Sequence, residues 1–267
     1  MLRSIALAVC LTVPSVTAAQ VGGLDDIVQL EILDGGQTDH GTYIGAVKVT
    51  LADGWKTYWR APGDAGIPPQ FDWRGSRNVG EVSFTWPSPK VFDQNGLRTI
   101  GYENQLILPV EITPKRAGKP VQLKGRMSFG VCSDVCVPAQ LKFDHDLDAS
   151  AGRNPTIAAA LAARPYSARE AGVKSATCRL SPTKDGMQIE ARVRLPATGG
   201  TEMMIIEPGD PSLWASEPQT RREGNVLTST AELISDSGTA FAIDRSEIRL
   251  TVLGGAHSVD IKGCTPG

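Results

Sequence analysis

Cys132 and Cys136 are separated by only three residues. Cysteine thiols form disulfides, exchange them with other thiols, or bind soft metal ions such as Cu(I). A disulfide brings its two Cα atoms within about 4.4–6.8 Å, whereas four extended steps span about 13 Å. We therefore expect the segment to turn back on itself as a loop between two strands, with Pro138 marking the restart of the second strand. A tight ring at a strand junction can be strained and exposed, and such disulfides are the more easily reduced ones.

Three interpretations of this pair remain open: a redox-active disulfide, a structural staple of a hairpin, and a Cu(I) site. His40, His145 and His257 are the chain's histidines, and none lies at ligand spacing from the cysteines. Met127 is the nearby thioether, and we interpret it as a core residue. We therefore assign no metal and no cofactor.

The other cysteines favour a second, structural disulfide. Cys10 lies in an apolar leader, which leaves Cys178 and Cys264 beside the first pair. Four cysteines allow three connectivities, and the spacing favours Cys132–Cys136 with Cys178–Cys264. Closing a loop of about 87 residues stabilises a fold by about 4.6 kcal/mol, against about 2 kcal/mol for a five-residue ring. Stability alone is thus a weaker reason for the short ring.

The first residues predict export. A short positive start, an apolar run and the small residues Thr17-Ala18-Ala19 are typical of a secretory signal peptide, which we place at residues 1–19. We therefore expect a periplasmic protein. No later run approaches the roughly 18 apolar residues of a membrane helix, so we expect no membrane span. The net charge is -2 and the basic residues are scattered, so we expect no nucleic-acid partner.

The elements that must position the cysteines read as strands. Short runs of alternating or apolar residues are broken by turn residues, which is typical of antiparallel sandwiches. We predict an all-β fold of two immunoglobulin-like sandwiches: residues 20–150, a helical linker at 151–172, and residues 173–267. Asn154-Pro155 is a helix start, with Asn as N-cap and Pro at the first helical position. The expected strands are 27–33, 43–51, 79–86, 106–113, 121–131, 139–147, 187–195, 203–206, 226–233 and 248–253.

Asp134 and the aromatic residues of the first half each have two interpretations. Asp134 lies inside the ring, where a carboxylate would raise thiol pKa values and make the pair a poor free nucleophile; it can equally be a simple turn residue. The tryptophans Trp55, Trp59, Trp73 and Trp86, with Tyr58, are best explained by core packing. A glycan-binding surface is the alternative.

The segment Phe129–Pro138 resembles the cysteine loop of the amino-terminal periplasmic domain of DsbD and of its copper-sensitivity relative ScsB. Further matches lie upstream in the same order, over about residues 24–147. They are Gly54–Pro68, Trp86-Pro87-Ser88-Pro89, Gly101-Tyr102 and Leu108-Pro109-Val110.

This resemblance implies an immunoglobulin-like domain that carries electrons by thiol–disulfide interchange. Cys136 would form the mixed disulfide with thioredoxin-fold periplasmic partners, and Cys132 would resolve it. Because the family's membrane and thioredoxin-like domains are missing here, we expect a separate membrane electron donor. A cap loop within residues 91–99 would cover the pair through Phe92 or Leu97, although either can simply be an apolar loop residue. Copper handling through the same cysteines, and a non-catalytic interaction module, remain alternatives.

Overall fold

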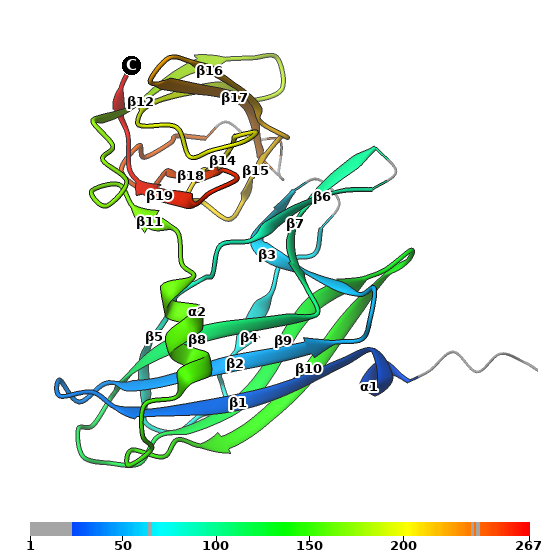
Figure 1. The fold of residues 1–267 in the computed structure, drawn as a ribbon, viewed down its shortest axis with the longest axis vertical. Helices are drawn as coiled ribbons and strands as arrows, with labels where there is room; N and C mark the ends of the chain where they lie inside the picture. Colours follow the sequence, from blue (N-terminus) through cyan, green and yellow to red (C-terminus); the bar gives the residue numbers. More distant parts are fainter. Residues whose placement is uncertain (1–22, 64–65, 95, 236–237, 239–240) are drawn as a thin grey trace, which may run out of the picture.

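The computed structural model describes residues 23–63, 66–94, 96–235, 238 and 241–267. The predicted signal peptide lies outside these residues. The described chain forms two β-sandwiches, which we call the first and the second domain (Figure 1). The predicted all-β class is confirmed, because strands dominate and pair antiparallel except in the two short parallel pairs β11–β19 and β12–β20.

The elements of the first domain run from a single helical turn to a long hairpin. They are α1 (Leu24–Ile27), β1 (Val28–Gln37), β2 (Tyr43–Leu51), β3 (Lys56–Gly63), β4 (Gln70–Asp72), β5 (Val79–Phe84), β6 (Lys90–Gln94), β7 (Leu97–Glu103), β8 (Gln105–Pro114), β9 (Gln122–Cys132) and β10 (Cys136–Asp146). One sheet has the order β1-β2-β8-β5, and the other has the order β10-β9-β3-β7-β6, with β4 paired to β9.

The second domain follows a linking helix. That helix is α2 (Pro155–Ala162), and the elements of the second domain are β11 (Tyr166–Ser167), β12 (Ser175–Pro182), β13 (Met187–Arg194), β14 (Met203–Glu207), β15 (Leu213–Ala215), β16 (Gln219–Glu223), β17 (Val226–Ser235), β18 (Arg249–Leu253), β19 (Ser258–Lys262) and β20 (Thr265–Pro266). Its sheets have the orders β11-β19-β18-β14 and β15-β17-β13-β12-β20, with β16 paired to β17.

Each domain buries its own apolar core between its sheets. Along β2 the predicted face of Tyr43, Gly45, Val47, Val49 and Leu51 is buried, as alternation requires of a strand that covers a core. The tryptophans also pack into or against the first core, which confirms their interpretation as core residues: Trp59 is fully buried, and Trp55, Trp73 and Trp86 are partly buried.

Helix α2 begins as the sequence predicts. The Asn154 side chain accepts hydrogen bonds from the backbone N–H groups of Thr156 at 3.0 Å and Ile157 at 3.4 Å. The helix is packed rather than free, because Ile157 contacts Ala46 and Ile107 on the outer face of the first sheet. The helix is thereby fixed to the first domain, whereas residues 166–167 of the predicted linker form β11 and pair with β19 of the second domain.

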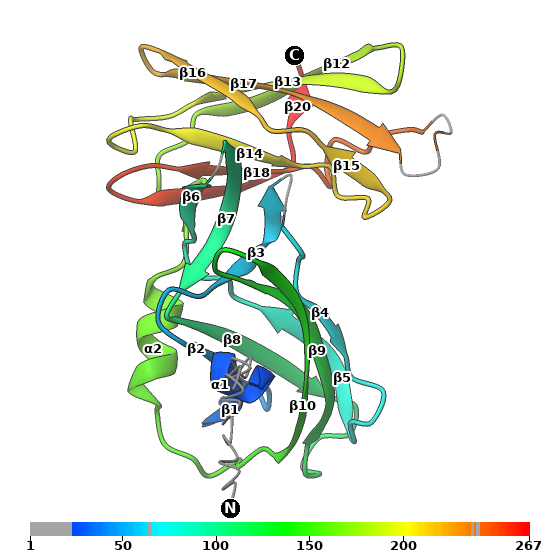
Figure 2. The same cartoon turned by 90° about the vertical axis from the view of Figure 1, so that its right-hand side faces the viewer.

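The two domains share an interface. Ile205 and Leu253 of the second domain belong to the core cluster of the first. The ends of β3 and of the β6–β7 hairpin reach the second domain (Figure 2). There Arg98 forms an ion pair of 2.6 Å with Glu217. A cleft of about 490 Å³ lies between the domains, and Arg60 contributes to its wall.

Candidate functional site

The β9–β10 hairpin places the two short-spaced cysteines opposite each other. Cys132 and Cys136 are direct register partners at the end of the ladder, with their Cα atoms 4.1 Å apart, and they form a disulfide. The loop between the two strands is shorter than the sequence predicts. Strand β10 begins at Cys136, so Pro138 lies inside the strand and does not mark its start. Proline is tolerated there because β10 is the edge of its sheet and has no further strand to bond.

The two sulfurs differ in exposure. Cys132 is 5% exposed, whereas Cys136 lies on the surface beside Val135, which is 67% exposed. Because Cys132 ends a central strand and Cys136 begins an edge strand, only the second is open to an approaching molecule. An exchange reaction needs an accessible sulfur and a leaving sulfur, and this disulfide supplies one of each kind.

A tyrosine lies against both sulfurs. The Tyr58 hydroxyl oxygen is 2.6 Å from Cys132 Sγ and 3.1 Å from Cys136 Sγ. Burial raises the pKa of the Tyr58 phenol above its usual value, so it keeps its proton at neutral pH. A protonated phenol donates a hydrogen bond, and it is therefore placed to stabilise negative charge on sulfur.

Strand β3 brings Tyr58 to the disulfide. Thr57 pairs with Val131 in the β3–β9 ladder, and its hydroxyl donates a hydrogen bond of 2.9 Å to the Gly130 carbonyl. Glycine is required at position 130, because a Cβ there would lie 2.7 Å from a Tyr58 ring carbon. At Gly66 a Cβ would come within 2.8 Å of the same ring. Two glycines thus leave room for the phenol.

The predicted cap residues lie on the β6–β7 hairpin. Lys56 is the register partner of Cys132, so both side chains project from the same face of the sheet. The Lys56 ammonium lies 4.8 Å from the centre of the Phe92 ring, which places this ring over that face. Leu97 begins β7 and is 53% exposed.

The structure also places the remaining residues that the sequence singled out. Cys178 and Cys264 form the second disulfide, with a Cα–Cα distance of 5.7 Å, and Cys178 is buried in the second core. This is the pairing that the sequence spacing favours. Asp134 is exposed in the hairpin turn, and Met127 is fully buried in the first core. Within the part of the chain that the structure describes, no three His, Cys, Asp or Glu side chains gather as metal ligands.

Sequence reasoning missed Tyr58 as a site residue. It interpreted this tyrosine as core packing, and did not assign a strand to residues 56–63. The available signal was Tyr58's place in the Gly54–Pro68 motif, because a polar ring among tryptophans, with glycine nearby, needs a partner for its hydroxyl.

Comparisons with known proteins give a matching family and a similar fold. Residues 29–147 match the family described as thiol:disulfide interchange protein DsbD, N-terminal. The fold is similar to the N-terminal periplasmic domain of ScsB from Proteus mirabilis, with a TM-score of 0.68 and 22% identity over 91% of this chain and 95% of that one. The Neisseria meningitidis DsbD N-terminal domain in its reduced form matches 48% of this chain and 91% of its own length, with 22% identity and a TM-score of 0.29.

No curated protein matches the chain. In the described residues, no helix has the length and apolar character needed to traverse a bilayer.

Proposed function

We propose that this chain is a periplasmic protein that relays electrons through the Cys132–Cys136 disulfide, since residues 29–147 match the family of DsbD amino-terminal domains. One observation carries the proposal: an exposed sulfur is bonded to a buried one, and a protonated phenol touches the buried sulfur at 2.6 Å. A purely structural staple has no use for this asymmetry.

The exchange step follows from the geometry. A partner thiolate attacks Cys136 Sγ, a mixed disulfide forms, the Cys132–Cys136 bond breaks, and Cys132 leaves as a thiolate. Exchange is faster when the leaving thiol has a lower pKa. The Tyr58 hydroxyl, which is closer to Cys132 than to Cys136, would lower that pKa by donating a hydrogen bond to the thiolate. The partner's second thiol then attacks the partner's own sulfur in the mixed disulfide, which releases Cys136 as a thiol and leaves the partner oxidised. To pass the electrons on, the Cys136 thiolate attacks the disulfide of an oxidised partner, and Cys132 then attacks Cys136 Sγ, which re-forms the Cys132–Cys136 bond and releases that partner as a dithiol.

The partners are proposed from the same chemistry. They are thioredoxin-fold periplasmic proteins on one side and a separate membrane electron donor on the other. Both would engage Cys136, since it is the exposed sulfur. The Cys178–Cys264 disulfide would be structural, because it ties the first long strand of the second domain to the segment entering β20.

We further propose that the β6–β7 hairpin caps the pair through Phe92. The Phe92 ring is held over the sheet face by the Lys56 ammonium, and such a contact contributes about 0.5–1 kcal/mol at an exposed site. A cap held this weakly can lift when a partner docks.

Trapping tests the function. Cys132→Ala leaves the exposed Cys136 thiol without a resolving partner, so the variant is expected to accumulate as a mixed disulfide with periplasmic proteins. Cys136→Ala, whose remaining thiol is buried, is the matched control and is expected to trap far less. Equal trapping by the two variants, or none by either, would count against the proposal.

A further inference from the structure

The pairing of strand β3 with β7 is interrupted directly after Tyr58. Tyr58 pairs with Gly101 of β7, but the next pair joins Gly63 to Thr99. Residues 59–62 therefore stand opposite Ile100 alone, which makes a long bulge in β3. Since the register of this bulge is not set by pairing with β7, other contacts must fix the chain that follows Tyr58.

Trp59 and Arg60 supply those contacts. Trp59 is fully buried in the first core, and the Arg60 guanidinium lies 4.0 Å from the centre of its ring. Arg60 then reaches the second domain, where it donates two hydrogen bonds to Glu207, of 2.9 and 3.0 Å, and one of 3.3 Å to Thr251. The bulge is thus held from outside the first domain.

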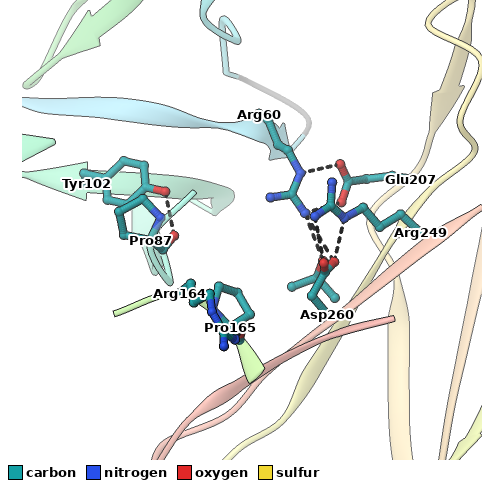
Figure 3. A network of polar contacts seen from close by, with 9 residues as sticks. Arg60, Pro87, Tyr102, Arg164, Pro165, Glu207, Arg249 and Asp260 are labelled. Atoms are coloured by element: carbon teal, nitrogen blue, oxygen red, sulfur yellow. Dashed lines mark hydrogen bonds and ion pairs between the residues drawn. The ribbon is translucent and has the colours of Figure 1, made fainter. Parts of the chain in front are cut away.

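The anchor continues into a charge network (Figure 3). Arg60 lies 3.7 Å from Asp260, which accepts two hydrogen bonds from Arg249, of 2.6 and 2.7 Å. The side chains of Arg60 and Glu207 are 14% and 19% exposed. Paired, hydrogen-bonded charges at this depth are geometrically specific, and removing one partner is costly. The network therefore fixes the bulge more firmly than surface ion pairs would.

The bulge also touches the tyrosine. Close packing joins the Tyr58 ring, Pro62 and Gly66, because a Cβ on Gly66 would approach Pro62 Cβ to 2.3 Å and the ring to 2.8 Å. Movement of residues 59–62 would consequently move the Tyr58 hydroxyl relative to the sulfurs.

We propose that Arg60 is a positioning residue through which the second domain holds Tyr58 against the Cys132–Cys136 disulfide and so sets its reduction potential. The second domain would thereby have a role in the exchange site. Only the biological use of the reduction potential rests on the proposed function; the positioning of Tyr58 by Arg60 does not. The phenol stabilises the reduced form by hydrogen bonding to thiolate, so a displaced phenol makes the disulfide harder to reduce.

The experiment measures the equilibrium constant for reduction of the disulfide by dithiothreitol. Arg60→Met is expected to lower this constant at least threefold, which corresponds to about 14 mV at 29.6 mV per tenfold change. Tyr58→Phe is expected to lower it similarly. The double variant is expected to match Tyr58→Phe alone, because non-additivity reports that Arg60 acts through Tyr58.

A matched control lies inside the second domain. Arg222 binds Glu202 with two hydrogen bonds, and these side chains are 19% and 6% exposed, but the pair does not reach β3. Glu202→Gln should destabilise the second domain without changing the equilibrium constant. Glu207→Gln removes one charge of the Arg60 pair and should change the equilibrium constant in the same direction as Arg60→Met. If Arg60→Met fails to fold, Glu207→Gln is measured in its place.

Three results would overturn the proposal: an unchanged constant in Arg60→Met or its substitute, full additivity with Tyr58→Phe, or an equal effect of Glu202→Gln. Reduction of the wild-type disulfide by glutathione tests the proposed function separately. A wild-type disulfide that glutathione cannot reduce would contradict the relay, whereas a wild type that glutathione reduces, with no response to Arg60→Met, would contradict only the positioning role.

Discussion

The Tyr58 hydroxyl lies 2.6 Å from the sulfur of Cys132, the buried member of the exposed–buried disulfide. The phenol is therefore closest to the sulfur that would leave in the proposed exchange, in which a partner attacks Cys136. Its hydrogen bond is worth most when that sulfur carries charge, because hydrogen bonds to ionised groups are about twice as strong as neutral ones. The predictions that follow test this relationship and the elements that support it.

Tyr58→Phe should slow reduction of the disulfide by glutathione about fivefold, which corresponds to about 1 kcal/mol for one hydrogen bond. The ring remains and continues to fill its site, so access should not change. Stopped-flow or alkylation-quench kinetics at neutral pH measure the rate. Tyr43→Phe, which alters a buried tyrosine of β2 outside the site, is the control and should react at the wild-type rate. A faster Tyr58→Phe variant would show that the phenol acts only as a shield.

Tyr58 should titrate above the ordinary tyrosine value of about 10, because burial raises the pKa of its phenol. The folded state then holds this proton more tightly than the unfolded state. Its contribution to stability is fully present below pH 10 and is lost as the pH rises through the folded value. Tyrosinate absorbance of the wild type minus that of Tyr58→Phe measures it. A difference signal with a midpoint at or below pH 10 would contradict the burial argument.

Phe92→Ala should speed reduction of the disulfide, on the order of threefold, if the ring limits access to the sulfurs. Leu97→Ala is the matched control on the same hairpin, and it should have little effect because Leu97 is already 53% exposed. Glutathione kinetics compare the two variants. If Leu97→Ala alone accelerates the reaction, the cap residue is Leu97; if neither does, the hairpin is not a cap.

Removal of the second disulfide by Cys178→Ser with Cys264→Ser should cost about 2–5 kcal/mol of unfolding free energy. Urea unfolding of the second domain measures this loss. Under native conditions the variant should keep the wild-type reduction potential at Cys132–Cys136, because the interface through Arg60 stays folded. A changed potential in a variant with a native circular dichroism spectrum would assign Cys178–Cys264 more than a structural role.

The sequence was most informative where pattern and chemistry are local. Alternation predicted β2 with its observed bounds, Asn154-Pro155 predicted the start of α2, and cysteine spacing favoured the observed pairs. Each of these features depends on residues close in sequence, or on a choice among few possibilities. The all-β class follows from the same signals.

The sequence was least informative where contacts join distant segments. The Tyr58 hydroxyl meets sulfurs 74 and 78 residues away, and Arg60 meets Glu207 across 147 residues. Strand β3 was not predicted because tryptophan, proline and glycine break its alternation, and its bulge is held by the second domain rather than by its own pattern. Such contacts depend on how the strands are ordered in the sheets, which local patterns do not specify.

The reduction potential of Cys132–Cys136 in the wild-type protein tests the central claim most directly. Equilibration with glutathione redox buffers, followed by alkylation of free thiols, gives the value. An exchange disulfide should lie near −200 mV, roughly within the range of thioredoxin-fold oxidoreductases. A value below about −300 mV, typical of structural disulfides, would contradict the account and leave Cys132–Cys136 as a staple.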